Sequence, residues 1–461
     1  MNRLPSAFRG VPGQRWERDL EEDTEELWDP ILKDQGDGDT ISGLIQNVLK
    51  IAVNIPVVDD LNFFDRFSTV RDEAARMTAQ HEKAPSVSLK ALKDAIPEHC
   101  FKSSLLTSSL YLARDIAYAA ALVYCALKIP SLESVWLRGI AWTLYGFAQG
   151  CVGTGLWIMG HECGHGAYSD YPLINDIIGW AVHSSLLVPY FSWQITHARH
   201  HRYTGHMEKD TAFVPSTEAE YRAKHNLQHN DLKELAEDTP IMGLINLLAH
   251  QLGGWQLYLL AYVTSGPDST PEKSKAGSGT RSHFDPFGKL FTRDQRVKVA
   301  LSTLGVTIMA SILFYLSTII GKFEIFCLYI IPNLWVHHWL VAITYLHHTH
   351  PSVAHFSADE WTFVKGSIST VDRSFGFIGR HFFHEIIDFH VVHHVFSRIP
   401  FYNAEEATKA IRPLLGDSYI EQKDENFLKS LYTTFTTCLY VTEIHDSDLG
   451  NVFRWASKKA D

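Results

Sequence analysis

Four long runs of apolar residues interrupt an otherwise polar chain, and they come in two pairs. The first pair covers residues 108–129 and 135–160, and the second covers residues 299–320 and 325–346. Each run has about 20 residues or more, the length at which a helix crosses the hydrocarbon core of a bilayer. Only a short polar turn separates the members of a pair, so each pair predicts a helical hairpin across a membrane.

Two hairpins place every large polar segment on one side of the membrane. These segments are residues 1–107, 161–298 and 347–461. Arg293, Arg296 and Lys298 flank the third span on that side, and the positive-inside rule makes it the cytosolic side. We therefore expect both termini in the cytosol.

The remaining segments are less regular. Residues 1–42 are acidic and rich in Gly and Asp, which predicts disorder. Residues 43–58 have helical periodicity and predict a short amphipathic helix, either on the membrane surface or packed on the protein. Residues 173–192 and 240–263 are apolar but interrupted by polar residues, which indicates interfacial or buried segments. Residues 265–286 have the composition of a flexible linker.

A few residues inside the spans need an explanation of their own. Arg114 and Asp115 lie near the polar end of the first span, where we expect them to extend to the interface. Pro332 predicts a kink in the fourth span. His337 and His338 lie in the same span, and we expect them to pack or hydrogen-bond there, without binding a metal.

Composition excludes several classes of protein. The chain of 461 residues has 41 basic and 52 acidic residues, and a net charge of −11 gives no support for nucleic-acid binding. Six cysteines lie scattered without a CxxC pair, so we expect reduced thiols and no disulfide framework. The N-terminus lacks the apolar core of a secretory signal. The unusual residue is histidine, with 25 copies.

Most of the clustered histidines lie in three short motifs next to the spans, HECGH, HARHH and HVVHH. They are His161 and His165, then His197, His200 and His201, and last His390, His393 and His394. On a helix, positions i, i+3 and i+4 share a face, so we expect each motif to present its imidazoles in one direction. Eight imidazoles exceed the four ligands of one zinc ion and predict two metals. Iron is the metal of choice if the site handles dioxygen.

The first motif also fits H-E-x-x-H, the zinc site of a metalloprotease. A membrane zinc protease would have this motif inside a span and a distant aspartate as third ligand, but the Asp37-Gly38 pair lies in the polar head. We therefore expect Glu162 to orient a ligand by hydrogen bonding. A metal transporter is a further alternative, and we reject it because the histidines flank the spans and do not form a path through them.

The three motifs and their surroundings resemble a known family. HECGHGAYSD, HARHHRYTGHMEKDTAFVP and EWTFVKGSISTVDRSFGFIGRHFFH are similar to membrane-bound fatty-acid desaturases, in particular fungal delta-12 and omega-3 acyl-lipid desaturases. The resemblance covers about Ser88 to Tyr419. It implies an all-α integral membrane fold, with four spans under a cytosolic helical cap. We divide the chain into a head at 1–87, a desaturase domain at 88–420 and a cytosolic tail at 421–461.

The resemblance also implies a ninth metal ligand at the end of the fourth span. His348 in YLHHTHP matches that position, and His347 and His350 are alternatives. Thr344 stands one turn earlier, where some relatives have asparagine.

Other residues near the motifs are candidates for supporting roles. Asn175 and Asp176 are candidates for orienting the histidines. His206, His381 and His384 are either ordinary core residues or partners of the ligands. Gly205 is expected to end the helix before His206.

The implied activity is insertion of a cis double bond into an acyl chain, with two iron ions and dioxygen. Oleoyl-to-linoleoyl conversion is the first expectation, and an omega-3 desaturase, a hydroxylase or an acetylenase of the same family are the alternatives. The chain has no HPGG haem segment, so a separate cytochrome b5 and its reductase are the implied electron donors. Lys458 and Lys459 resemble a retrieval signal of the endoplasmic reticulum.

Overall fold

The structure is a computed structural model that describes residues 87–225, 240–271, 279–423, 425–446 and 449–456. Three predictions lie outside the described residues. They are the disordered head, the amphipathic helix at 43–58 and the Lys458–Lys459 signal.

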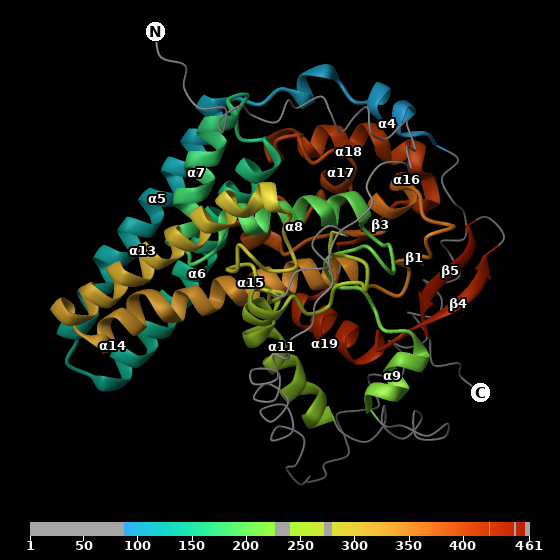
Figure 1. The fold of residues 1–461 in the computed structure, drawn as a ribbon. Helices are drawn as coiled ribbons and strands as arrows, with labels where there is room; N and C mark the ends of the chain where they lie inside the picture. The colour runs from blue at the N-terminus through green and yellow to red at the C-terminus, as the bar shows by residue number, and fades with distance from the viewer. Residues whose placement is uncertain (1–86, 226–239, 272–278, 424, 447–448, 457–461) are drawn as a thin grey trace.

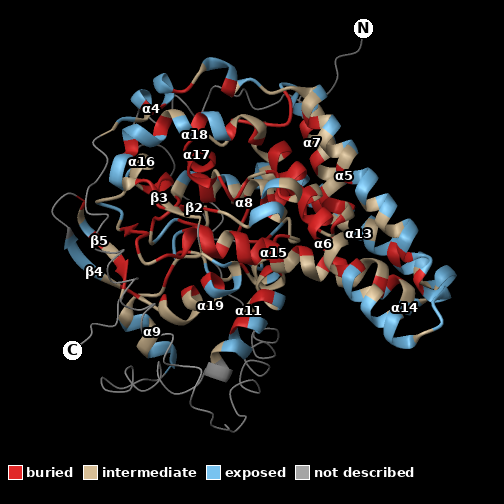
Figure 2. Cartoon of the chain, turned by 180° about the vertical axis from the view of Figure 1, so that it is seen from behind, coloured by how far each residue is buried: buried red, intermediate tan, exposed pale blue. Residues whose placement is uncertain are grey.

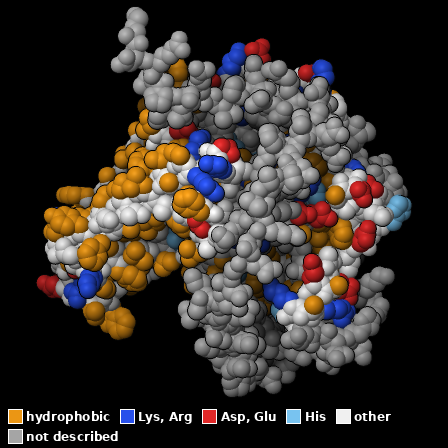
Figure 3. All heavy atoms as spheres, in the orientation of Figure 1, with side chains coloured by type: hydrophobic (Ala, Val, Ile, Leu, Met, Phe, Trp, Pro, Cys, Tyr) orange, Lys and Arg blue, Asp and Glu red, His pale blue; other side chains and the backbone are white. Residues whose placement is uncertain are grey.

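Long helices with apolar surfaces form one arm of the molecule, which we call the membrane bundle. They are α5 (Leu105–Ala126), α6 (Val135–His165), α13 (Arg296–Ile320) and α15 (Ile331–His348). In Figure 1 they run together toward the lower left, away from the strands. Hydrophobic side chains cover this arm (Figure 3), and Trp136 is 81% exposed. Such a surface is typical of a protein in contact with lipid.

Three segments of the described chain are long and apolar enough to cross a membrane. They are Leu105–Ser131, Arg293–Ile320 and Lys322–His348, and each contains one of the predicted runs. The other predicted run, 135–160, lies in α6, which is about 46 Å long. Several glycines and polar residues lower its hydropathy, and α5, α7 and α15 pack against it. The count of four spans therefore stays a prediction.

Local sequence signals fix the ends of these helices. The side chains of Ser104 and Ser134 cap α5 and α6 by accepting backbone N–H bonds. Gly166 ends α6 with φ +70°, a conformation that glycine adopts without strain. Before Pro332 the chain passes through the short α14 (Lys322–Ile325) and a π-helical turn (Phe326–Ile330). A kink was expected at Pro332, and the helix is irregular directly before it, in this wide turn.

The two interrupted apolar runs form helices beside the bundle. The first gives α7 (Pro172–Ser185) and the start of α8 (Tyr190–Tyr203). Trp180 on α7 donates its indole N–H to the Leu301 carbonyl on α13 at 2.8 Å. The second run gives α11 (Pro240–Ala261), which packs against α15. Both segments thus support the spans.

Two predictions about polar segments are wrong. Residues 279–286, expected as part of a flexible linker, pack on the protein: His283 is fully buried and its Nε2 lies 3.0 Å from Thr196 Oγ1. Asp115, expected to reach the interface, is only 2% exposed and lies 2.7 Å from His384. In both places a buried polar partner, far away in the sequence, holds the residue inside.

The rest of the described chain forms a cap over one end of the bundle. Its helices are α4 (Leu89–Ala95), α9 (Glu218–His225), α16 (Phe363–Ser367), α17 (His390–Val395), α18 (Phe401–Leu415) and α19 (Phe427–Thr437). Buried residues concentrate where α6, α8, α15 and α17 meet (Figure 2). This meeting point lies at the junction of bundle and cap.

The cap also contains strands, so the prediction of an all-helical fold needs correction. β1 (His355–Phe356), β5 (Gly450–Trp455) and β4 (Val441–Asp446) form an antiparallel sheet in that order. β2 (Val371–Arg373) pairs in parallel with β3 (Ile420–Gln422). Most of these strands are too short to show a period of two in the sequence. The described parts of the expected tail, residues 421–423, 425–446 and 449–456, therefore belong to the cap.

Candidate metal centre

Four helices bring their histidines together at the junction of bundle and cap. The first motif forms the last turn of α6, the second lies on α8 and the third forms most of α17. His348 is the last residue of α15. All nine predicted ligands therefore approach one region from helix ends and faces, which are rigid supports.

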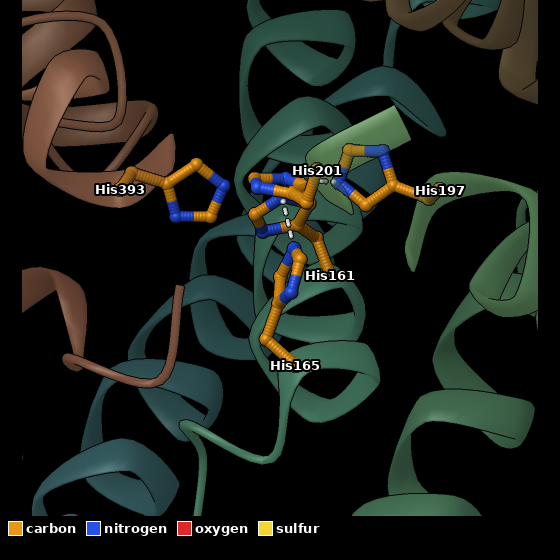
Figure 4. Close-up of side chains that lie close together, drawn as sticks. All are labelled: His161, His165, His197, His201 and His393. Carbon is orange, nitrogen blue, oxygen red and sulfur yellow. Dashed lines mark hydrogen bonds between the residues drawn. The ribbon is translucent and has the colours of Figure 1, made fainter. Parts of the chain in front are cut away.

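Five of the rings form a first group, shown in Figure 4. They are His161, His165, His197, His201 and His393, whose candidate ligand atoms lie within 4.8 Å of one another. The Nε2 atoms of His161 and His165 are 3.2 Å apart, and those of His197 and His201 are 3.1 Å apart. The rings point toward a common centre.

A second group lies beside the first. His200, His348 and His394 have ligand atoms within 4.8 Å of one another, and the Nε2 atoms of His200 and His348 are 3.1 Å apart. His390 adds a fourth ring, with its Nε2 atom 3.1 Å from that of His394. Two compact groups of five and four imidazoles thus lie side by side.

The prediction that each motif points in one direction is wrong for the second and third motifs. His200 belongs to the second group and its neighbour His201 to the first. In the same way His394 belongs to the second group and His393 to the first. Adjacent helical residues point about 100° apart, so one helix can supply both groups.

The donor set fits metal ions. Two imidazole nitrogens that bind one ion at about 2.1 Å and at right angles lie about 3.0 Å apart. The four Nε2 pairs above, at 3.1–3.2 Å, match this spacing. Burial lowers the pKa of His165 to about 3, and it holds the pKa of His201 well below its ordinary value. Neutral rings are the form that binds metal.

Hydrogen bonds from the second ring nitrogen orient several of these histidines. His200 Nδ1 donates to Asp210 Oδ1 at 2.7 Å, and His394 Nδ1 donates to Thr204 Oγ1 at 3.1 Å. Such carboxylate and hydroxyl partners fix the ring and its tautomer. Asp210 was not predicted from the sequence. Its only signal is an acidic residue ten positions after His200, in TGHMEKD.

Glu162 lies where it was predicted to act, next to the first group. Its Oε1 is 3.4 Å from His161 Nδ1, and its Oε2 accepts the Phe401 backbone N–H at 3.1 Å. Burial raises the pKa of Glu162 to about 8. The carboxyl therefore faces the His161 ring and the start of α18.

Asn175 and Asp176 lie away from the histidine groups. The Asn175 side chain bonds Ser169, through its hydroxyl at 2.6 Å and its carbonyl at 2.8 Å. The Asp176 carboxylate is 4.0 Å from Lys298 Nζ. These bonds hold the turn after α6 and join α7 to α13, so neither side chain bonds a histidine of the motifs.

The alternatives to His348 have other partners. His347 places its Nδ1 2.5 Å from the Ile343 carbonyl and its Nε2 3.0 Å from the Ile387 carbonyl, so both ring nitrogens face backbone. His350 Nδ1 accepts the Ser352 N–H at 3.1 Å. Thr344 donates to the Leu340 carbonyl of its own helix. His348 is therefore the ring of this segment that faces the second group.

The remaining candidate histidines bond residues outside the two groups. His206 follows Gly205, which has φ +72°, and its Nδ1 accepts the Glu208 N–H. His337 bonds Gln256 at 2.8 Å inside the bundle. His381 stacks on Phe377, and His384 bonds Asp115. None of these bonds reaches a ring of the two groups.

Comparisons with known proteins agree with this geometry. Residues 134–425 match the family model for fatty acid desaturases. The chain is 39% identical to an oleate hydroxylase from Claviceps purpurea, over 82% of each chain. It is 38% identical to a Delta(12)-oleate desaturase from Trichosanthes kirilowii, over 82% of this chain and 97% of the relative. A Delta(12) fatty acid desaturase from Mortierella alpina is 37% identical, over 78% and 90%.

The family match covers the three histidine motifs, the helices α6, α13 and α15, and much of the cap. The comparisons confirm the resemblance that the motifs indicated. The chain therefore belongs to the fatty acid desaturase family and is an oxygen-dependent oxidoreductase.

Proposed function

We propose that this protein is a delta-12 desaturase that converts oleoyl to linoleoyl chains with dioxygen and two electrons. The nine histidines would hold two iron ions, five rings around one and four around the other. The observation that supports this most directly is the division of the rings into two groups with Nε2 spacings of 3.1–3.2 Å. The names of the Trichosanthes and Mortierella relatives support the choice of delta-12.

The iron ions would supply the oxygen chemistry, which no side chain can perform on an unactivated methylene group. The protein's own residues hold and protect the site. Asp210 keeps the proton of His200 on Nδ1, which leaves Nε2 free to bind metal. Trp157, Trp193 and Trp339 are each at most 6% exposed and belong to one apolar core beside the groups, so they exclude water.

The setting of the reaction is part of the proposal. The substrate would be an acyl chain in phospholipid or acyl-CoA form, which reaches the histidines from the membrane bundle. Electrons would come from a separate cytochrome b5 and its reductase. The protein would reside in the endoplasmic reticulum membrane with four spans and both termini in the cytosol.

A hydroxylase is the second candidate, because the Claviceps relative at 39% identity is named an oleate hydroxylase. The two activities are distinguished by their products.

Expression in a host that makes oleate but no dienes tests both candidates. We expect new linoleate in the wild type and none with His200→Ala. A hydroxylated C18 product that also depends on His200 would establish the hydroxylase instead. If no product forms from any added acyl chain, although the protein is membrane-inserted and contains iron, the proposal is wrong.

A further inference from the structure

The segment that leads into the third motif is anchored inside the membrane bundle. It runs from a π-helical turn (Ile378–Phe382) to α17, and His384 lies in its middle. His384 Nε2 is 2.7 Å from Asp115 Oδ2 on α5, and the two side chains are 0% and 2% exposed. A carboxylate inside an apolar helix is costly without a partner. His384 is one of two partners that offset this cost for Asp115.

Arg114 completes this contact. Its Nε and Nη2 donate to Asp115 Oδ1 at 3.0 and 2.8 Å, and Nη2 also donates to the His381 carbonyl at 3.0 Å. Both carboxylate oxygens are therefore bonded. The segment is held at two points three residues apart, at His381 and at His384.

The backbone of the segment fits tightly between α5 and α6. A Cβ atom on Gly155 of α6 would lie 2.4 Å from the Phe382 carbonyl oxygen, so only glycine admits the segment at this depth. His384 and Glu385 have φ +50° and +58°. Two successive left-handed residues with side chains are uncommon, and such a conformation persists only where surrounding contacts fix it.

The carbonyl groups just after His384 reach the histidine region. The Ile386 carbonyl accepts the Nδ1–H of His390 at 3.1 Å. The Ile387 carbonyl accepts the Arg373 N–H at 3.0 Å and lies 3.0 Å from His347 Nε2. The partner that orients His390 is therefore only two residues from the anchor on α5.

We propose that the Asp115–His384 pair, which we call the α5 anchor, positions the third histidine motif against the other two. Asp115 and His384 are positioning residues and bind no metal themselves. The anchor fixes the position of the Ile386 carbonyl between the helices. Because that carbonyl accepts the Nδ1–H of His390, the anchor also fixes the direction of the His390 ring. This inference rests on the proposed metal centre, because it concerns the ligands of that centre.

The test compares two substitutions of His384 in the full-length protein purified in detergent. His384→Leu removes the bond to Asp115, whereas His384→Gln places an amide N–H near the position of Nε2. We expect His384→Leu to lower the iron content per folded chain to roughly half or less, because orienting contacts typically change metal affinity 10- to 100-fold. Its Mössbauer spectrum should also change. His384→Gln should restore both readouts.

Tyr145→Phe is the matched control. It removes one part-buried hydrogen bond, from Tyr145 to the Leu328 carbonyl at 2.8 Å, in the N-terminal half of α6. We expect a lower midpoint of thermal unfolding with unchanged iron content and spectrum.

The outcomes separate this inference from the proposed function. If wild-type protein binds no iron, the metal centre itself is wrong. If the wild type binds iron and His384→Leu behaves like Tyr145→Phe, with lower stability but normal iron content and spectrum, the anchor has only a structural role. Asp115→Ala should reproduce His384→Leu, and the double variant should add little. Independent effects of the two substitutions would also overturn the inference.

Discussion

The two histidine groups differ in the hydrogen bonds that fix their rings in the absence of a metal ion. In the second group, Asp210, Thr204 and the Ile386 carbonyl accept the Nδ1–H of His200, His394 and His390 at 2.7–3.1 Å. In the first group, the Nδ1 atoms of His161 and His201 have no hydrogen-bond partner among the described residues. Glu162 Oε1 approaches His161 Nδ1 only to 3.4 Å.

This difference indicates how each group is organised. Hydrogen bonds to the second nitrogen fix ring direction and tautomer before a metal binds. The second group is therefore preorganised by the protein, whereas the first group depends more on the ion itself. We expect the ion of the first group to be the weaker bound of the two and the first to be removed by a chelator.

The largest effects test whether both groups are needed. His200→Ala and His201→Ala change neighbouring residues of α8 that belong to different groups. Each should lower the diene product by roughly 100-fold or more, because each removes a ligand outright. Fatty-acid profiles of expressing cells measure this. Activity near wild type in either variant would mean that its group does not take part in the reaction.

A smaller effect tests preorganisation of the second group. Asp210→Asn removes the charge that His200 Nδ1 faces and should weaken iron binding about tenfold. Stepwise removal by a chelator measures this: the second ion should now leave together with the first. Asp176→Asn is the matched control, because that carboxylate faces Lys298 and no histidine of the motifs. Unchanged stepwise release in Asp210→Asn would contradict the comparison.

The pH dependence of the metal-free protein tests the first group. Burial raises the pKa of Glu162 from its ordinary value of 4.5 to about 8, so the folded state binds a proton that the unfolded state releases. Its contribution to stability is fully present below pH 4.5 and is lost as the pH rises through about 8. The midpoint of thermal unfolding should fall over this window by more in wild type than in Glu162→Gln. Parallel curves would show that Glu162 is ionised in the folded protein.

The smallest effect concerns one hydroxyl. Thr204→Val keeps the shape of the side chain but removes the acceptor of His394 Nδ1. The loss should be about 1 kcal/mol, or roughly fivefold in iron affinity of the second group. Iron titration of the purified variant measures it. An equal loss of iron affinity in the first group would show that the two groups do not bind iron independently.

The sequence predicted which histidines lie close together better than it predicted how they divide into two groups. The sequence alone shows that histidines recur at helical spacing beside apolar runs, and it shows how many there are. The division of His200 from His201 depends on how α8 is rotated against α17 and α15, which only the packed structure determines. Asp210 lies beyond the turn at Gly205, so no helical spacing links it to His200.

The same reason explains the errors in the fold. Asp115 and His384 are 269 residues apart, and nothing near Asp115 in the sequence indicates that His384 is its second partner. The strands of the cap pair segments such as His355 and Phe453, which are also distant in the sequence. Spans and motifs are local patterns, whereas buried polar pairs and short strands are made by tertiary contacts.

The helices α8 and α17 each carry histidines of both groups. The distance between the two groups is therefore fixed by neighbouring residues within one turn of a helix. One inserted residue rotates all that follows it on a helix by about 100°. An insertion between residues 197 and 201, or between 390 and 394, would therefore pull the two centres apart, even if every histidine were kept. We therefore expect the spacing inside the second and third motifs to tolerate no insertion.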